Sequence, residues 1–137
     1  MIKNFSIIIP VYNEEGNILG LINEIFYHLS NKQFNFEIII INDSSTDNTE
    51  KILQNFSNNK SVILSNNEKN MGQSFSIFQG IKLSKYNNIV TIDGDGQNNP
   101  SDIINLLNLY FSSESIKLVG GIRNKRKDNL VKIISSK

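Results

Sequence analysis

The sequence contains no cysteine among its 137 residues. It therefore has neither a disulfide framework nor a thiolate metal site. It also lacks a long uninterrupted apolar run, because even the stretch Ile18–Leu29 is broken by Asn23 and Glu24. No segment is therefore predicted to span a membrane. The N-terminus lacks the charged-then-apolar pattern of a signal peptide, which favours a cytosolic location.

Three common ligand-binding fingerprints are absent as well. The sequence contains neither G-x-G-x-x-G nor G-x-x-x-x-G-K-[ST], so it predicts neither the usual dinucleotide site nor a P-loop. An EF-hand counted from Asp93 is excluded, because its sixth position is Asn98 instead of Gly and its twelfth is Ile104 instead of Glu. Bound phosphates would have to be held by a metal ion and by Arg or Lys side chains.

The charges are unevenly distributed along the chain. Residues 1–122 hold 8 Lys/Arg and 12 Asp/Glu, whereas residues 123–137 hold six Lys/Arg and one Asp. A basic end on an acidic chain indicates contact with an anion such as a nucleotide, a lipid phosphate or a membrane surface. The alternative, a solvated terminus with no ligand, stays open on charge alone.

Apolar runs of strand length alternate with segments of helical spacing. A length of 137 residues and a hydrophobic content of 39% fit one domain spanning residues 1–137. The alternation predicts an α/β fold with a mostly parallel sheet flanked by helices. Gly80, inside the third predicted helix, would allow close packing. The predicted strands are residues 5–11, 37–42, 62–64, 88–93 and 116–122, with helices between them and after Pro100.

Asp93 and Asp95 directly follow the fourth predicted strand, two positions apart. Side chains alternate along an extended chain, so both carboxylates can project to the same side. Paired carboxylates at the end of a buried strand suit Mg²⁺ or Mn²⁺, an ion usually shared with substrate phosphates. Asp-Gly-Asp-Gly is also good turn sequence, so a purely structural turn remains an alternative.

Polar residues end two other strands in the same way. Tyr12, Asn13 and Glu14 follow the first predicted strand, and Asp43 follows the second. Because the carboxyl ends of parallel strands share one edge of the sheet, these groups could converge on one ligand with Asp93 and Asp95. Asp43 could accept hydrogen bonds from a base or a ribose, although a turn or cap role is an alternative.

Four segments, in this order and spacing, resemble glycosyltransferase family 2, the inverting enzymes with the nucleotide-diphospho-sugar transferase (GT-A) fold. The resemblance covers essentially the whole chain. The segments are residues 6–15 (Ser-Ile-Ile-Ile-Pro-Val-Tyr-Asn-Glu-Glu), residues 41–49 (Ile-Asn-Asp-Ser-Ser-Thr-Asp-Asn-Thr), residues 70–72 (Asn-Met-Gly) with Gly80, and residues 93–97 (Asp-Gly-Asp-Gly-Gln) with Pro100.

Within this family the sequence is most similar to the polyprenyl-phosphate glycosyltransferases, the relatives of dolichol-phosphate mannose synthase. Residues 93–100 match their Asp-x-Asp-x-Gln pattern, and residues 121–137 resemble the bacterial undecaprenyl-phosphate branch. Full-length members continue beyond the equivalent of Lys137. The resemblance therefore implies that the chain is the nucleotide-sugar-binding part of a catalytic domain, truncated at its C-terminus.

The resemblance also implies a role for each matching residue. One group would frame the nucleoside, a second would hold Mg²⁺ or Mn²⁺, and a third would meet phosphates of the donor or acceptor. Asp95 and Arg123 are expected to act in catalysis, and Asp93 would also contact the donor. Lys132 stands where relatives often carry Arg, which keeps the charge but loses paired hydrogen bonds. The three groups are Pro10, Tyr12, Glu14 and Asp43; Asp93, Asp95 and Gln97; and Arg123, Lys132 and Ser136.

The implied reaction is transfer of a sugar from a nucleoside diphosphate, with UDP-sugar as the expected donor, to a polyprenyl phosphate with inversion at the anomeric carbon. The lipid phosphate oxygen would be the nucleophile, and it needs no strong general base because it is already anionic. The expected location is the cytoplasm, at the inner face of the membrane, with membrane contact through the part of longer members that follows. No nucleic-acid partner is expected.

Three alternatives stay open. The first is a nucleotidyltransferase, although the loop after the first strand, residues 12–15, is acidic instead of Gly-rich and basic. The second is a non-catalytic module that binds sugar nucleotides. The third is a family 2 transferase acting on a saccharide hydroxyl, which would need a general base from outside this chain.

Overall fold

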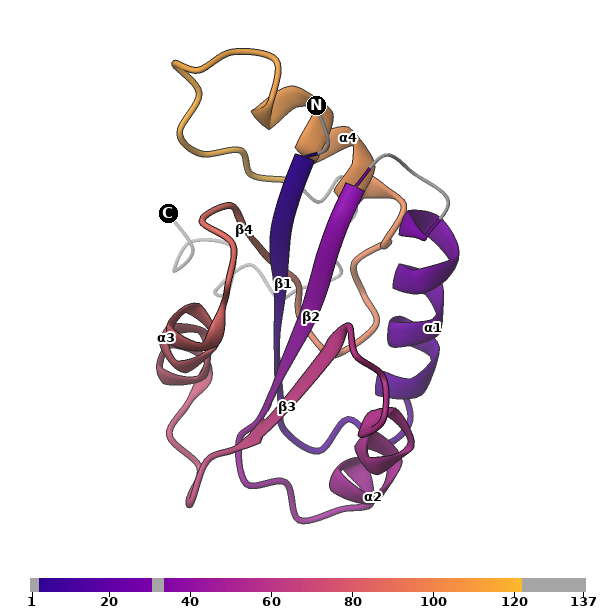
Figure 1. The fold of residues 1–137 in the computed structure, drawn as a ribbon. Coiled ribbons are helices and arrows are strands. Elements are labelled where there is room, and N and C mark those ends of the chain that lie inside the picture. Colours follow the sequence, from indigo (N-terminus) through magenta and orange to yellow (C-terminus); the bar gives the residue numbers. More distant parts are fainter. Residues whose placement is uncertain (1–2, 31–33, 122–137) are drawn as a thin grey trace, which may run out of the picture. The chain divides into compact units, whose positions relative to one another are not determined.

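The computed structural model describes residues 3–30 and 34–121. Strands and helices alternate along these residues, as the sequence pattern predicted (Figure 1). In chain order they are β1 (Lys3–Val11), α1 (Ile18–Leu29), β2 (Phe34–Asn42), α2 (Thr49–Leu53) with the 3₁₀ turn η1 (Gln54–Phe56), β3 (Val62–Asn66), α3 (Gln73–Leu83), β4 (Ile89–Thr91) and α4 (Asp102–Tyr110). The chain divides into two compact units, and the boundary in the sequence falls between Ile104 and Asn105. The whole sheet belongs to the first unit.

The four strands form one parallel sheet in the order β3-β2-β1-β4. Ile7 is the Cα partner of Ile38 on one side and of Val90 on the other. Because all neighbouring strands pair in parallel, the four strands end at the same edge of the sheet. This arrangement confirms the predicted parallel α/β fold.

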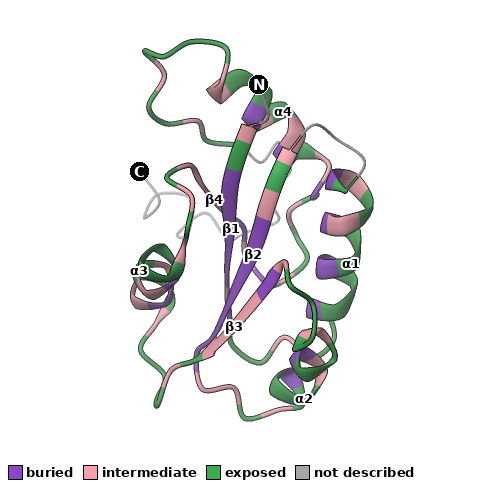
Figure 2. Cartoon of the chain, in the orientation of Figure 1, coloured by how far each residue is buried: buried purple, intermediate pink, exposed green. Residues whose placement is uncertain are grey.

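The two central strands, β1 and β2, form the core of the sheet. Residues 7–9 and 38–41 are isoleucines with no exposed surface. In Figure 1, α3 lies on one side of the sheet and α1 and α2 lie on the other, and Figure 2 shows the central strands buried between them. Strands covered on both faces need apolar side chains at successive positions, which explains the continuous isoleucine runs.

Helix α3 approaches β1 closely through Gly80, as the sequence predicted. A Cβ atom at Gly80 would overlap with Ile8 Cγ2 and would lie 3.2 Å from Ile8 Cγ1. Both residues belong to the buried layer, so a side chain at Gly80 has no space to occupy. Glycine at this position therefore sets the distance between α3 and the sheet.

We expect Gly80→Ala to lower the free energy of unfolding by about 1–3 kcal/mol, the usual cost of overpacking a buried site. Gly20, in α1, is the matched control because nothing lies within 4 Å of a Cβ built there. Gly20→Ala should stabilise the chain by about 0.5–1 kcal/mol through helix propensity. Urea denaturation of both variants measures the difference, and equal effects would show that α3 does not pack through Gly80.

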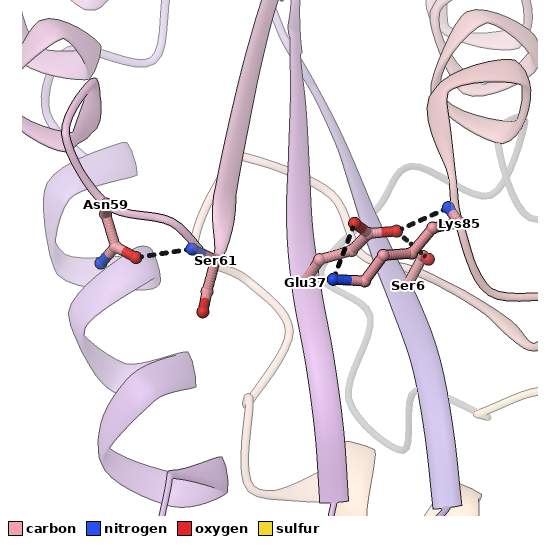
Figure 3. A network of polar contacts seen from close by, with 5 residues as sticks. All are labelled: Ser6, Glu37, Asn59, Ser61 and Lys85. Carbon is pink, nitrogen blue, oxygen red and sulfur yellow. Dashed lines mark hydrogen bonds and ion pairs between the residues drawn. The ribbon is translucent and has the colours of Figure 1, made fainter.

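A buried carboxylate that the sequence analysis did not single out connects three segments of the chain (Figure 3). Glu37, on β2, is only 3% exposed. Its Oε1 atom accepts hydrogen bonds from Ser6 Oγ at 2.6 Å and from the backbone N–H of Lys85 at 2.8 Å, and Lys85 Nζ lies 3.7 Å from Oε2. These contacts fix the connection between α3 and β4 to the two central strands.

The predicted fifth strand is wrong for the residues that the structure describes. Residues 116–121 have no strand geometry, and Leu118 is 88% exposed. Two consecutive glycines, Gly120 and Gly121, disfavour a strand, and an apolar run forms one only where a neighbouring strand pairs with it. Ile122, the last residue of the prediction, lies outside the described residues. Within residues 3–30 and 34–121, no helix is both long and apolar enough to cross a membrane.

Candidate functional site

A cavity of about 270 Å³ opens at the edge of the sheet where β1, β2 and β4 end. All of its lining residues belong to the first compact unit. Tyr12, Glu14, Asp43, Asp93 and Asp95 thus line one space, as their positions after parallel strands predicted, whereas Asn13 does not; that they share a ligand stays a prediction. The lining residues are Pro10, Val11, Tyr12, Glu14, Asp43, Gln73, Ser76, Asp93, Gly94 and Asp95.

Six of the predicted site residues line this cavity: Pro10, Tyr12, Glu14, Asp43, Asp93 and Asp95. Gln97 does not line it; its backbone N–H donates to Asp95 Oδ1 at 3.0 Å. The other three, Arg123, Lys132 and Ser136, lie outside the described residues, and so do their predicted phosphate contacts. The sequence analysis missed Gln73 and Ser76, because it predicted α3 but not which end of that helix faces the site.

Asp43, at the end of β2, is buried and holds the chain segment before α3. Its Oδ1 atom accepts hydrogen bonds from Asn67 Nδ2 at 2.6 Å and from the backbone N–H of Met71 at 2.8 Å. Its Oδ2 atom accepts one from the backbone N–H of Gly72 at 2.8 Å. A carboxylate at this point also complements the positive end of the α3 dipole. Among the described residues, Asp43 thus holds a distant segment and makes no turn or cap contact before Ser44 and Ser45, where the backbone N–H of Ser45 donates to Asn42 Oδ1 instead; its contact with a nucleoside stays a prediction.

These contacts determine the protonation of Asp43. Burial by itself raises the pKa of the carboxyl group, but the hydrogen bonds from Asn67, Met71, Gly72 and Ser76 outweigh it and hold the pKa below its ordinary value. Asp43 is therefore ionised at neutral pH despite being only 4% exposed. An ionised carboxylate accepts hydrogen bonds and donates none.

The loops after β1 and β2 are bound to each other beside the cavity. Asn13 Oδ1 accepts a hydrogen bond from the backbone N–H of Thr46 at 2.8 Å, and Asn13 itself has a left-handed backbone with φ 55°. The backbone N–H of Glu14 donates to Thr49 Oγ1 at 2.8 Å. Because the backbone is fixed at these points, Tyr12 and Glu14 are held at the rim, where Tyr12 is 46% exposed.

Gly94, between the paired carboxylates, lets the end of β4 approach the end of β1. A Cβ atom there would lie 2.7 Å from Val11 Cγ1 and 3.1 Å from the backbone oxygen of Pro10. Asp93 Oδ1 accepts a hydrogen bond from Gln73 Nε2 at 2.7 Å. Glycine at position 94 thus permits Asp93 and Asp95 to line the same cavity.

The carboxylates fit a hard divalent cation that shares its coordination with a ligand. In the part of the chain that the structure describes, no three His, Cys, Asp or Glu side chains gather closely enough to hold a metal ion. Mg²⁺ is usually bound by one or two carboxylates plus substrate phosphates, and not by a complete protein cage. Asp93 and Asp95 supply that number of oxygen ligands. Mg²⁺ and Mn²⁺ both suit such ligands.

Comparison with known proteins gives a family. The family model described as "Glycosyl transferase family 2" matches residues 6–136. An undecaprenyl-phosphate 4-deoxy-4-formamido-L-arabinose transferase from Pectobacterium atrosepticum is 32% identical over 138 residues, covering 99% of this chain and 42% of the relative. The chain thus spans about two-fifths of the length of that relative.

Solved structures share the fold. S. aureus TarS 1–349 in complex with UDP-GlcNAc superposes with a TM-score of 0.63 at 25% identity, over 78% of this chain and 32% of TarS. Glucosyl-3-phosphoglycerate synthase from Mycobacterium tuberculosis in complex with UDP gives a TM-score of 0.65 at 19% identity, over 82% of this chain and 41% of the synthase. The second likeness shows the fold alone, and both agree with the predicted GT-A architecture.

Proposed function

This chain belongs to glycosyl transferase family 2, and we propose that it is the donor-binding part of an inverting enzyme that transfers a sugar from a nucleoside diphosphate to a polyprenyl phosphate. The cavity at the carboxyl edge of the sheet is the proposed donor site. The named activity of the Pectobacterium relative supports a polyprenyl-phosphate acceptor. The UDP-GlcNAc bound to TarS supports a uridine donor.

The observation that carries the proposal is the charge of the cavity. Its lining includes four carboxylates, from Glu14, Asp43, Asp93 and Asp95, and no Lys, Arg or His side chain among the described residues. A diphosphate would be repelled by such a lining unless a cation lay between them. Mg²⁺ or Mn²⁺ held by Asp93 and Asp95 would supply that cation and stabilise the leaving diphosphate. Gln97 is proposed as a further ligand, although it does not line the cavity.

The remaining lining residues are proposed to hold the nucleoside. Tyr12 offers an exposed aromatic ring at the rim, against which a base can stack. Asp43 would accept a hydrogen bond from the base or ribose, and Pro10 and Glu14 would complete the wall beside it.

The acceptor half of the reaction involves residues that the structure does not describe. Arg123, Lys132 and Ser136 are proposed to contact phosphates of donor or acceptor, with Arg123 acting together with Asp95 in catalysis. The attacking oxygen of a lipid phosphate is anionic at neutral pH and requires no general base. A polyprenyl acceptor implies that the whole enzyme works in the cytoplasm, at the inner face of the membrane.

Calorimetric titration with UDP, GDP, CDP and ADP, each with and without Mn²⁺, tests the donor half of this proposal. We expect UDP to bind in the presence of Mn²⁺ and to bind much more weakly without it. Tighter binding of GDP, CDP or ADP than of UDP would show that the donor carries that base instead of uracil. Binding of no nucleotide, or equal binding with and without Mn²⁺, would contradict the proposed donor site.

A further inference from the structure

The side chain of Gln73 links α3 to the paired carboxylates. Gln73 is the first residue of α3 and lines the cavity. Its Nε2 atom donates a hydrogen bond to Asp93 Oδ1 at 2.7 Å. An amide nitrogen has no lone pair to offer a cation, so this atom acts on the carboxylate and not on a metal ion.

The backbone of Gln73 is held by the residues around it. The preceding residues, Met71 and Gly72, donate their N–H groups to the buried carboxylate of Asp43. One turn later, Ser76 Oγ donates to the backbone oxygen of Gly72 at 3.1 Å and accepts from Asn67 Nδ2 at 3.0 Å. Gly72 itself has φ +90°, a conformation that favours glycine. Gln73 therefore projects from a fixed point.

A continuous series of contacts thus joins the end of β2 to the end of β4. Asp43 fixes the segment before α3, that segment fixes Gln73, and Gln73 donates to Asp93. A donor on one oxygen of a carboxylate restricts rotation of that carboxylate and so sets where its lone pairs point. Residues that orient metal ligands in this way typically change metal affinity by about 10- to 100-fold when they are replaced.

We propose that Gln73 is a positioning residue that orients the Asp93 carboxylate for the divalent cation accompanying the nucleoside diphosphate. The inference rests on the proposed function, because it assigns Gln73 a part in that donor site. Gln73 is not proposed to contact the cation. It acts through Asp93, and Asp43 acts on Gln73 through the backbone of residues 71–72.

The test compares Gln73→Met with the parent chain in UDP titrations with and without Mn²⁺. Methionine keeps the length and helix propensity of glutamine and removes the donor. We expect the Mn²⁺-dependent part of UDP affinity to fall about 10- to 100-fold. Metal-free UDP affinity and the melting temperature should not change. Gln79→Met is the matched control, because Gln79 lies on the same helix and outside the cavity lining; it should bind like the parent.

The same substitution made in an Asp93→Ala chain distinguishes a positioning role of Gln73 from a general structural role. In an Asp93→Ala chain, Gln73→Met should cause no further loss, because the carboxylate that Gln73 is proposed to orient is missing. Two independent effects would instead add. The same loss in both backgrounds, or no loss in the first, would overturn the proposal. These outcomes differ from failure of the proposed function, in which the parent chain shows no Mn²⁺-dependent UDP binding and both proposals fall.

Discussion

Asp43→Ala is expected to destabilise the chain by on the order of 3 kcal/mol, because hydrogen bonds to a charged group contribute about 1.5–3 kcal/mol and buried donors left without partners cost more. The substitution removes the acceptor of the N–H groups of Met71 and Gly72, and it leaves Asn67 Nδ2 with its bond to Ser76 Oγ alone. Urea denaturation at pH 7 measures the loss. Glu24→Ala, which removes an exposed carboxylate on α1, is the control and should have little effect.

The same carboxylate predicts a pH dependence. The pKa of Asp43 is lower in the folded chain than its ordinary value, since its hydrogen bonds outweigh burial. Its contribution to stability is therefore complete above the unfolded-state pKa of about 3.9 and is lost as the pH falls through the folded-state pKa. Asp43→Asn should be less stable at pH 7 and should lack this acid-dependent component. Identical pH profiles for the parent and Asp43→Asn would contradict the role.

Asp43→Ala also distinguishes a nucleoside contact from a purely structural one. If Asp43 accepts a hydrogen bond from the nucleoside, UDP should bind roughly 10- to 150-fold more weakly, the equivalent of about 1.5–3 kcal/mol. Pyrophosphate, which has no base or ribose, should be affected far less. Equal weakening of both ligands would mean that Asp43 acts only by holding α3 and Gln73.

The second large effect is expected for Asp95→Ala. Loss of a direct ligand should weaken the Mn²⁺-dependent part of UDP binding by more than the roughly 100-fold upper range for an orienting residue. The fold should remain intact, because Asp95 is partly exposed and its hydrogen bond from the N–H of Gln97 is local. Calorimetry with and without Mn²⁺ measures the change. Asp102→Ala, at the start of α4 and outside the cavity lining, is the control.

An Asp95→Ala chain that binds UDP as tightly as the parent in the presence of Mn²⁺ would contradict the assignment of Asp95 as a ligand. Asp93 and Gln97 would then be the remaining candidates. Weakening of equal size with and without Mn²⁺ would instead indicate that Asp95 contacts the nucleotide directly or supports the cavity wall.

The fold was predictable where burial dictates the sequence. Strands β1 and β2 are covered on both faces, and this leaves an unbroken run of isoleucines that no helix of ordinary amphipathic pattern would show. The convergence of Tyr12, Asp43 and Asp93 was predictable for a topological reason. Parallel strands all end at one edge of the sheet. The residues that follow these strands therefore lie close together, and this does not depend on the conformations of the loops.

Other features depend on side-chain directions that a pattern does not encode. The position of Gln73 in the cavity follows from where α3 begins, which Asp43 determines from a distant part of the sequence. Glu37 looked like an ordinary polar start to a strand, yet β2 begins earlier, at Phe34, and places it in the interior. Residues 116–119 have the composition of a strand, but two glycines follow them and none of the four strands of the described sheet pairs with them, so residues 116–121 have no strand geometry.

A nucleoside diphosphate and a divalent cation are proposed to bind together at the carboxyl edge of the sheet. Nuclear magnetic resonance of the ¹⁵N-labelled chain tests this directly. With UDP and Mg²⁺, amide signals of the cavity residues should shift, those of Tyr12, Asp43, Gln73 and Asp95 among them; with UDP and Mn²⁺, the signals around Asp93 and Asp95 should broaden most. No response to UDP with either ion, or shifts confined to residues outside the cavity, would contradict the account.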